Sequence, residues 1–121
     1  MQALGLIETL GYTTAVSAAD AALKAADVQL VAVEKVIGVG GSLGVTIHLS
    51  GDVAAVSASV EAGKAEALRI GKVISAHVIA KAHEDVSSKI LTKFLFAPQT
   101  HDIATTASKE PADKKLPDEL E

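Results

Sequence analysis

The chain has 121 residues, a formal net charge of −4, 2% aromatic residues and no cysteine. This length suits one domain with a hydrophobic core, and the mild acidity argues against nucleic acid, which requires a clustered basic surface. A chain without cysteine has no disulfides, zinc thiolate sites, iron–sulfur ligands or cysteine nucleophiles. The sequence shows neither a signal-like start nor an apolar run that could span a bilayer, so we expect a cytoplasmic chain with no membrane partner.

The first third of the chain predicts a strand, a helix and a second strand. Residues 2–9 are apolar and short, and Gly11 then interrupts them. We expect Thr13 or Thr14 to cap a helix that runs to about Ala26. Its inner stripe, at helical spacing, is expected to be Val16, Ala19, Leu23 and Ala26. Residues 28–37 then resume strand character.

A glycine-rich segment from Gly38 to Gly44 follows this second strand. Apolar and polar residues alternate directly after it, which predicts a half-buried strand, so the segment is interpreted as an enlarged hairpin loop. A phosphate-binding loop is a weak alternative, because such loops open a helix and here a strand follows. A third interpretation is that exposed backbone amides of this segment line an opening.

The second helix is expected to begin at a Ser50 or Asp52 cap and to end at Gly71. Its expected inner stripe is Val53, Val56, Val60, Ala67 and Ile70, with Gly63 on the same face. A helical glycine costs about 1 kcal/mol relative to alanine, so we expect another backbone to approach closely at Gly63. Residues 73–80 predict a fourth strand and residues 84–91 a short helical turn.

The resulting order, βαββαβ, predicts an α+β fold of the ferredoxin-like kind with a short C-terminal helix. We assign this domain to residues 1–97. From Pro98 onward the composition changes, with six acids against three lysines. Residues 98–121 are therefore predicted to form a polar, mobile tail.

No catalytic constellation is visible in the sequence. Histidines stand at positions 48, 77, 83 and 101 without metal-ligand spacing, so we expect them to be surface or edge residues and expect no metal or other cofactor. Ser42, His48 and Asp52 could be named as a triad, but their spacing does not support one. An enzyme is the least supported class.

Several motifs, in order along residues 1–91, together resemble hexameric bacterial microcompartment shell proteins, the BMC family. They include Met1–Thr9, Ala18–Ala21, Glu34-Lys35, Gly51–Val56 and His77–Val86. The resemblance implies a structural subunit and not an enzyme. It implies cyclic homo-hexamers that tile, with other shell proteins, into a sheet enclosing enzymes.

Three features are carried over from this resemblance. Lys24 matches an edge lysine that packs against neighbouring hexamers, and Lys81 stands where the family usually has an arginine. A lysine lacks the guanidinium fork, so its edge contacts are expected to differ. The loop after Lys35 corresponds to the turn that rings the sixfold axis, here several residues longer. The pore-lining residues implied are Gly38, Val39, Gly40, Gly41 and Ser42.

Two functional hypotheses follow. The first is a shell subunit with a central pore for small polar metabolites, in which six longer loops could also occlude the opening. The second is an oligomeric, ferredoxin-like regulator whose glycine-rich segment binds a nucleotide or another anion.

Overall fold

A computed structural model describes residues 2–39 and 41–97. It confirms the predicted order of elements and adds a short 3₁₀ turn after the last helix. The bounds are β1 Ala3–Leu10, α1 Tyr12–Ala25, β2 Gln29–Val39, β3 Ser42–Gly51, α2 Val53–Ile70, β4 Val73–Ile79, α3 Glu84–Lys89 and η1 Leu91–Lys93. The tail predicted for residues 98–121 and the predicted pore residue Gly40 lie outside the described residues.

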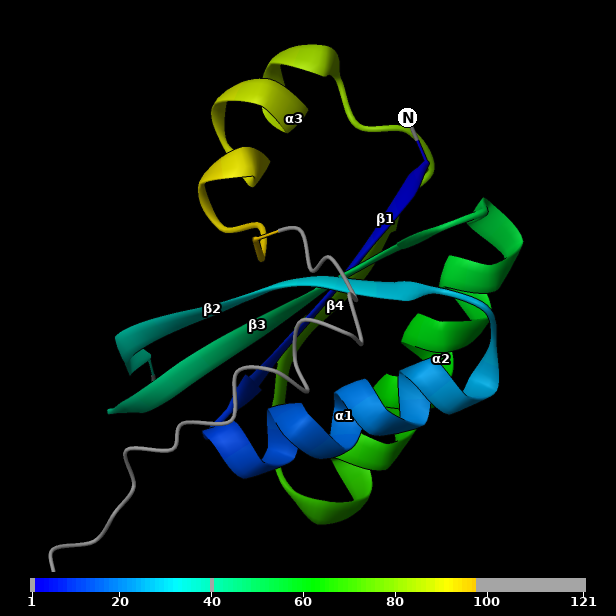
Figure 1. The fold of residues 1–121 in the computed structure, drawn as a ribbon. Coiled ribbons are helices and arrows are strands. Elements are labelled where there is room, and N and C mark those ends of the chain that lie inside the picture. The colour runs from blue at the N-terminus through cyan, green and yellow to red at the C-terminus, as the bar shows by residue number, and fades with distance from the viewer. Residues whose placement is uncertain (1, 40, 98–121) are drawn as a thin grey trace, which may run out of the picture.

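The four strands form one sheet in the order β2-β3-β1-β4, and every neighbouring pair is antiparallel. α1 and α2 cover one face of this sheet, whereas α3 lies on the other side (Figure 1). This arrangement is the ferredoxin-like one that the order of elements predicted.

The covered face carries an aliphatic core in which alanine is the commonest residue. α1 packs on α2 so closely that a Cβ at Gly63 would lie 2.8 Å from the carbonyl oxygen of Ala18 and 2.7 Å from Cδ1 of Ile7. Only glycine fits at this position, because any side chain would overlap the α1 backbone. The expected close approach of another backbone at Gly63 is therefore confirmed.

This close packing also corrects the stripe expected on α1. The residues that α1 buries are Thr14, Ala15, Ala18, Ala19 and Ala22. Of the four residues expected inside, Ala19 is buried, Ala26 is half-buried, and Val16 and Leu23 are exposed. Alanine faces α2 because a larger side chain would push the two helices apart, so the bulkier residues of α1 lie outside.

α2 follows its expected stripe only in its central part. Val56, Val60, Gly63 and Ala67 are buried as expected, and Ser59 joins them. The two terminal members of the expected stripe, Val53 and Ile70, are exposed. They lie in the first and last turns, where the buried face of the helix no longer includes them.

The observed helix boundaries agree with the predicted ones more closely than the observed capping residues do. Gly11, not a threonine, occupies the N-cap of α1, and Thr13 lies inside the helix. Asp52 is the N-cap of α2, but its side chain makes no capping hydrogen bond. Gly71 ends α2 as expected, and its N–H donates to the carbonyl of Ala67.

Candidate functional site

The segment expected to be an enlarged loop is instead a β-hairpin whose strands remain paired close to the turn. Val36 pairs with Gly44, Ile37 with Leu43 and Val39 with Ser42, so the two strands stay paired almost to the turn. β-Branched residues favour extended backbone, and here they outweigh the glycines between them. The prediction of an enlarged loop was wrong for this reason.

Glycine is nonetheless needed at two points of the hairpin. Gly38 has a φ of +100° and lies where the pairing register shifts, and Gly41 has a φ of +79° beside the turn. Other residues rarely adopt such angles. The glycines that suggested a loop therefore permit an irregularity in the ladder and a tight reversal of the chain.

The hairpin is hydrogen-bonded to the body of the subunit at its base, and no third strand among residues 2–39 and 41–97 pairs with its tip. β1 ends where Leu10 pairs with Gly44, and the N–H of Gly11 donates to the carbonyl of Leu43 at 2.7 Å. Beyond this point β2 and β3 continue as a two-stranded ribbon that projects from the rest of the sheet (Figure 1).

The described members of the predicted pore-lining set lie together at the end of this ribbon. Gly38, Gly41 and Ser42 are exposed, and Ser42 lies opposite Val39 in the ladder. Ser42 thus offers an exposed hydroxyl beside the turn. In the part of the hairpin that the structure describes, no helix begins, so these residues lack the helix N-terminus that a phosphate loop uses.

The two predicted edge lysines lie on different elements, and both are exposed. Lys24 lies in the last turn of α1, where its Nζ is 2.7 Å from Oδ2 of Asp20. That hydrogen bond and the Asp20 charge raise the pKa of Lys24 above its ordinary value. Lys24 therefore presents an ammonium group that already has a partner on its own helix. Lys81 lies between β4 and α3.

His48 departs most from its expected place, because it is buried rather than a surface residue. Its pairing partners are Leu6 and Ala32, on the sheet face away from α1 and α2. The segment after α3 covers this face: the ring of Phe94 lies 6.3 Å from that of His48. In the sequence, His48 alternates with core residues, which places it on the opposite face of its strand. Burial of that face by a segment much later in the chain produces no pattern in the residues around His48.

Burial lowers the pKa of His48, because the charged imidazolium loses its hydration. Glu34 partly opposes this shift, with its Oε2 3.9 Å from Nε2 of His48. Neither ring nitrogen has a hydrogen-bond partner among the described residues. Ser42 lies six residues away along the same extended strand, roughly 20 Å at the rise of a strand, so the structure does not assemble a catalytic triad.

The remaining described histidines have structural explanations. His77 is exposed on β4, opposite Leu6. His83 caps α3, its Nδ1 accepting a hydrogen bond from the backbone N–H of Asp85 at 3.0 Å. Within residues 2–39 and 41–97, no group of three metal-ligating side chains could hold an ion, and none of the helices is long and apolar enough to cross a membrane.

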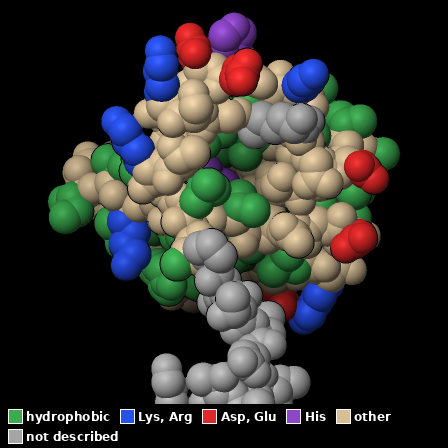
Figure 2. All heavy atoms as spheres, turned by 45° about the horizontal axis from the view of Figure 1, so that its top comes forward, with side chains coloured by type: hydrophobic (Ala, Val, Ile, Leu, Met, Phe, Trp, Pro, Cys, Tyr) green, Lys and Arg blue, Asp and Glu red, His purple; other side chains and the backbone are tan. Residues whose placement is uncertain are grey.

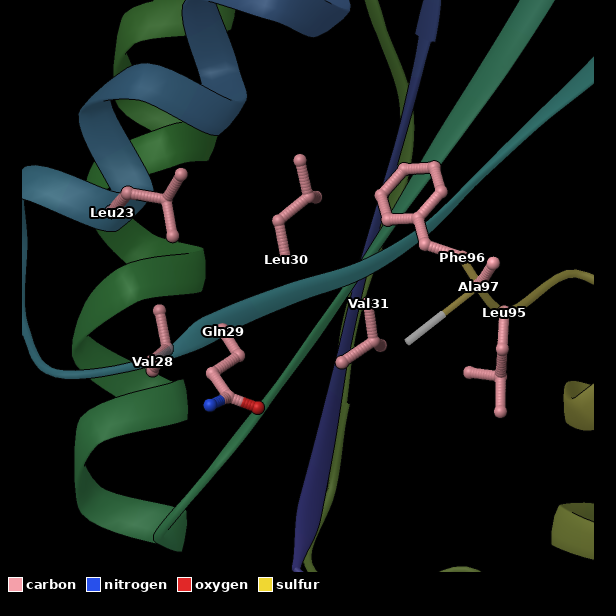
Figure 3. Close-up of a pocket in the computed structure, with 8 residues that line it drawn as sticks. All are labelled: Leu23, Val28, Gln29, Leu30, Val31, Leu95, Phe96 and Ala97. Carbon is pink, nitrogen blue, oxygen red and sulfur yellow. The ribbon is translucent and has the colours of Figure 1, made fainter. Parts of the chain in front are cut away.

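An apolar hollow lies along β2, the edge strand of the sheet. The N–H of Phe96 donates to the carbonyl of Val31 at 2.9 Å, and Leu95 forms a bridge with Ala32. Leu30 and Phe96 lie on one side of the strand and Val31 on the other (Figure 3). The full lining is Leu23, Val28, Gln29, Leu30, Val31, Leu95, Phe96 and Ala97. With Gln29 as its one polar side chain, this hollow suits packing rather than chemistry.

Comparison with known proteins gives a consistent result. A family model described as the BMC domain matches residues 3–82. The chain is 49% identical over 92 residues to the bacterial microcompartment shell protein PduA of Citrobacter freundii, which covers 76% of this chain and 94% of that protein. It is 48% identical over 86 residues to EutM of Salmonella typhimurium, covering 71% and 85% of the two chains.

A carboxysome protein and a solved structure extend this list. Identity to the carboxysome shell protein CcmK2 of Synechococcus elongatus is 50% over 86 residues, 69% of this chain and 80% of that one. The crystal structure of a microcompartment protein from Desulfitobacterium hafniense matches with a TM-score of 0.59 and 34% identity, and covers 83% of this chain. This chain spans 51% of that protein.

Proposed function

This chain belongs to the BMC domain family, and on that premise we propose that it forms a cyclic hexamer with the β2–β3 hairpin of each copy at the central axis. Its relatives are shell proteins, so the chain is a structural subunit of a bacterial microcompartment shell and not an enzyme. Its place is in the shell, beside other shell proteins and around enclosed enzymes.

The hairpin is the observation that supports this arrangement. It projects as a two-stranded ribbon, and such a ribbon is only marginally stable by itself. Copies gathered around an axis would give each ribbon the neighbours that it lacks within one subunit. Symmetric closure of this kind is the usual form of soluble homo-oligomers.

In this hexamer the hairpin ends surround a pore, lined by Gly38, Val39, Gly40, Gly41 and Ser42. The exposed Ser42 hydroxyl supports the passage of small polar metabolites. The regulator hypothesis is not supported, because this segment continues as paired strands and the relatives are shell proteins.

Native mass spectrometry of the full chain, and of a chain ending at residue 97, tests the hexamer. We expect six copies in both. A monomer, dimer or trimer for the full chain would contradict the proposal. A hexamer from the full chain alone would make residues 98–121 part of the assembly and contradict a domain confined to residues 1–97.

We further propose that Lys24 and Lys81 contact neighbouring hexamers in the sheet. Both are exposed, Lys24 in the last turn of α1 and Lys81 between β4 and α3, and a long flexible side chain can reach a neighbouring hexamer from such a position. Lys24→Ala and Lys81→Ala are expected to leave the hexamer intact and to reduce extended sheets in electron micrographs. Lys64→Ala, which removes an exposed lysine from α2, is the matched control. Unchanged sheets in both edge variants would contradict this assignment.

A further inference from the structure

The end of the hairpin carries the most exposed large apolar side chain described in the protein. Ile37 is 90% exposed, and the next most exposed, Leu68 on α2, is 56%. In the sheet ladder Ile37 lies opposite Leu43, one pair beyond the last contact of β3 with β1. Ile37 therefore adds almost nothing to packing within one subunit, although exposing it to water is unfavourable.

The hairpin also lacks the charges that usually protect a projecting ribbon. Residues 36–44 contain no charged side chain, whereas exposed strands usually carry charge that prevents edge-to-edge pairing. The adjoining charge, Lys35, lies with its Nζ 5.3 Å from the centre of the Tyr12 ring at the hairpin base. Hydrophobic atoms form the outermost part of the projection at the left of Figure 2.

We propose that the Ile37 side chains of six copies form an apolar collar around the central opening. This inference rests on the proposed hexamer with the hairpin at its axis. A narrow apolar ring is poorly wetted, and so it slows ions and other charged solutes that cannot shed their hydration. Ser42 then lies beside the collar, and the pore admits small uncharged polar solutes in preference to anions.

The extended ladder makes such a collar possible. A flexible loop would let an isoleucine side chain turn away from the axis, whereas Ile37 is held in a strand paired with Leu43. The hydrogen bond from Gly11 to Leu43 ties that pair to the start of α1. The direction of Ile37 is thus fixed by the body of the subunit.

The test is the ionic conductance, in potassium chloride, of hexamer sheets spread across a solid-state aperture. Ile37→Thr keeps the β-branched shape that favours a strand and replaces the ethyl branch of the side chain by a hydroxyl. We expect it to raise the conductance per pore roughly tenfold, and Ile37→Val to change it little. Ile74→Thr is the matched control, because Ile74 is an exposed isoleucine on β4, at the opposite edge of the sheet.

Native mass spectrometry of the same samples separates the two proposals. If the unmodified chain is not a hexamer, the proposed function fails. If Ile37→Thr is hexameric and its conductance is unchanged, the collar is overturned and the hexamer stands. If Ile37→Thr and Ile37→Ala both lose the hexamer, Ile37 is a contact between subunits, and the collar is overturned as well.

Discussion

The face of the sheet beneath α1 and α2 and the β2–β3 hairpin use apolar residues in opposite ways. Under the helices the buried residues are aliphatic and closely packed, and the packing admits no extra carbon at Gly63. In the hairpin Ile37 stands almost free of its own subunit. The helix-covered face forms a buried cluster within one copy of the chain, whereas Ile37 would gain neighbours only in the proposed hexamer.

This contrast shows how one fold separates stability from assembly. Substitutions under the helices are expected to change the free energy of unfolding. Substitutions in the hairpin are expected to change the passage of solutes through the proposed pore.

Gly63→Ala should break the helix-covered face. The new Cβ would lie within 3 Å of the Ala18 carbonyl oxygen, which belongs to the backbone and cannot rotate away. We expect the free energy of unfolding to fall by about 3 kcal/mol, at the upper end of overpacking costs. Urea denaturation at one fixed protein concentration measures it.

Ser57→Ala is the control for this change, since Ser57 is exposed on the same helix. If Gly63→Ala is as stable as this control, then α1 and α2 are not in the close contact described here.

Acid should lower the free energy of unfolding through His48, which is buried on the sheet face opposite α1 and α2. Its pKa is lowered by burial, so the unfolded chain takes up a proton first as the pH falls through about 6.5. Stability should therefore be constant above that pH and decline below it, by at most about 1.4 kcal/mol per pH unit. Glu34 reduces the decline, because its charge favours the protonated ring.

The measurement is the urea midpoint at pH 7.5 and at pH 5.5 for the unmodified chain, His48→Leu and His77→Gln. The decline should shrink in His48→Leu and persist in His77→Gln, which alters an exposed histidine. An equal decline in all three proteins would show that His48 is not the group responsible.

Ser59→Ala should stabilise the helix-covered face. The Ser59 hydroxyl is fully buried and has no hydrogen-bond partner among the described residues. Removing an unsatisfied buried hydroxyl is expected to raise the free energy of unfolding by about 1 kcal/mol. Thermal unfolding of Ser59→Ala against Ser57→Ala measures this, and a loss of stability would reveal that the hydroxyl has a partner.

The smallest effect on stability is expected from Lys24→Ala. Its ion pair with Asp20 is exposed to solvent on both sides, and such pairs contribute little. The midpoint of urea denaturation should not move measurably. A clear shift would show that Lys24 supports the subunit itself and not only contacts between hexamers.

The sequence predicted the order of elements well because helical and strand periodicities are local signals. It predicted the close approach at Gly63 as well, since a helical glycine is costly without a reason. It did not predict which side of α1 is buried, because that depends on the distance between two helices. The alanine face became the inner one only through contact with Gly63.

The sequence predicted where the chain reverses between the second and third strands, but not the shape of that reversal. Glycines between Gly38 and Gly44 indicated a loop, whereas the pairing of Val36, Ile37 and Val39 extends the strands through it. His48 was missed because Phe94, 46 positions later, covers it. Both the pairing of the hairpin strands and the burial of His48 depend on contacts between residues that are distant in the sequence.

The end of β1 at the Leu10–Gly44 pair has a consequence for pore engineering. Past that pair the ribbon can be lengthened or shortened without disturbing any strand of the body. Side chains alternate between the two faces of a strand. An even or an odd number of inserted residues therefore has opposite effects on where Ile37 points. Adding two residues to each strand before Ile37 would carry this residue of the proposed collar farther along the ribbon on the same face, whereas adding one would turn Ile37 to the other face.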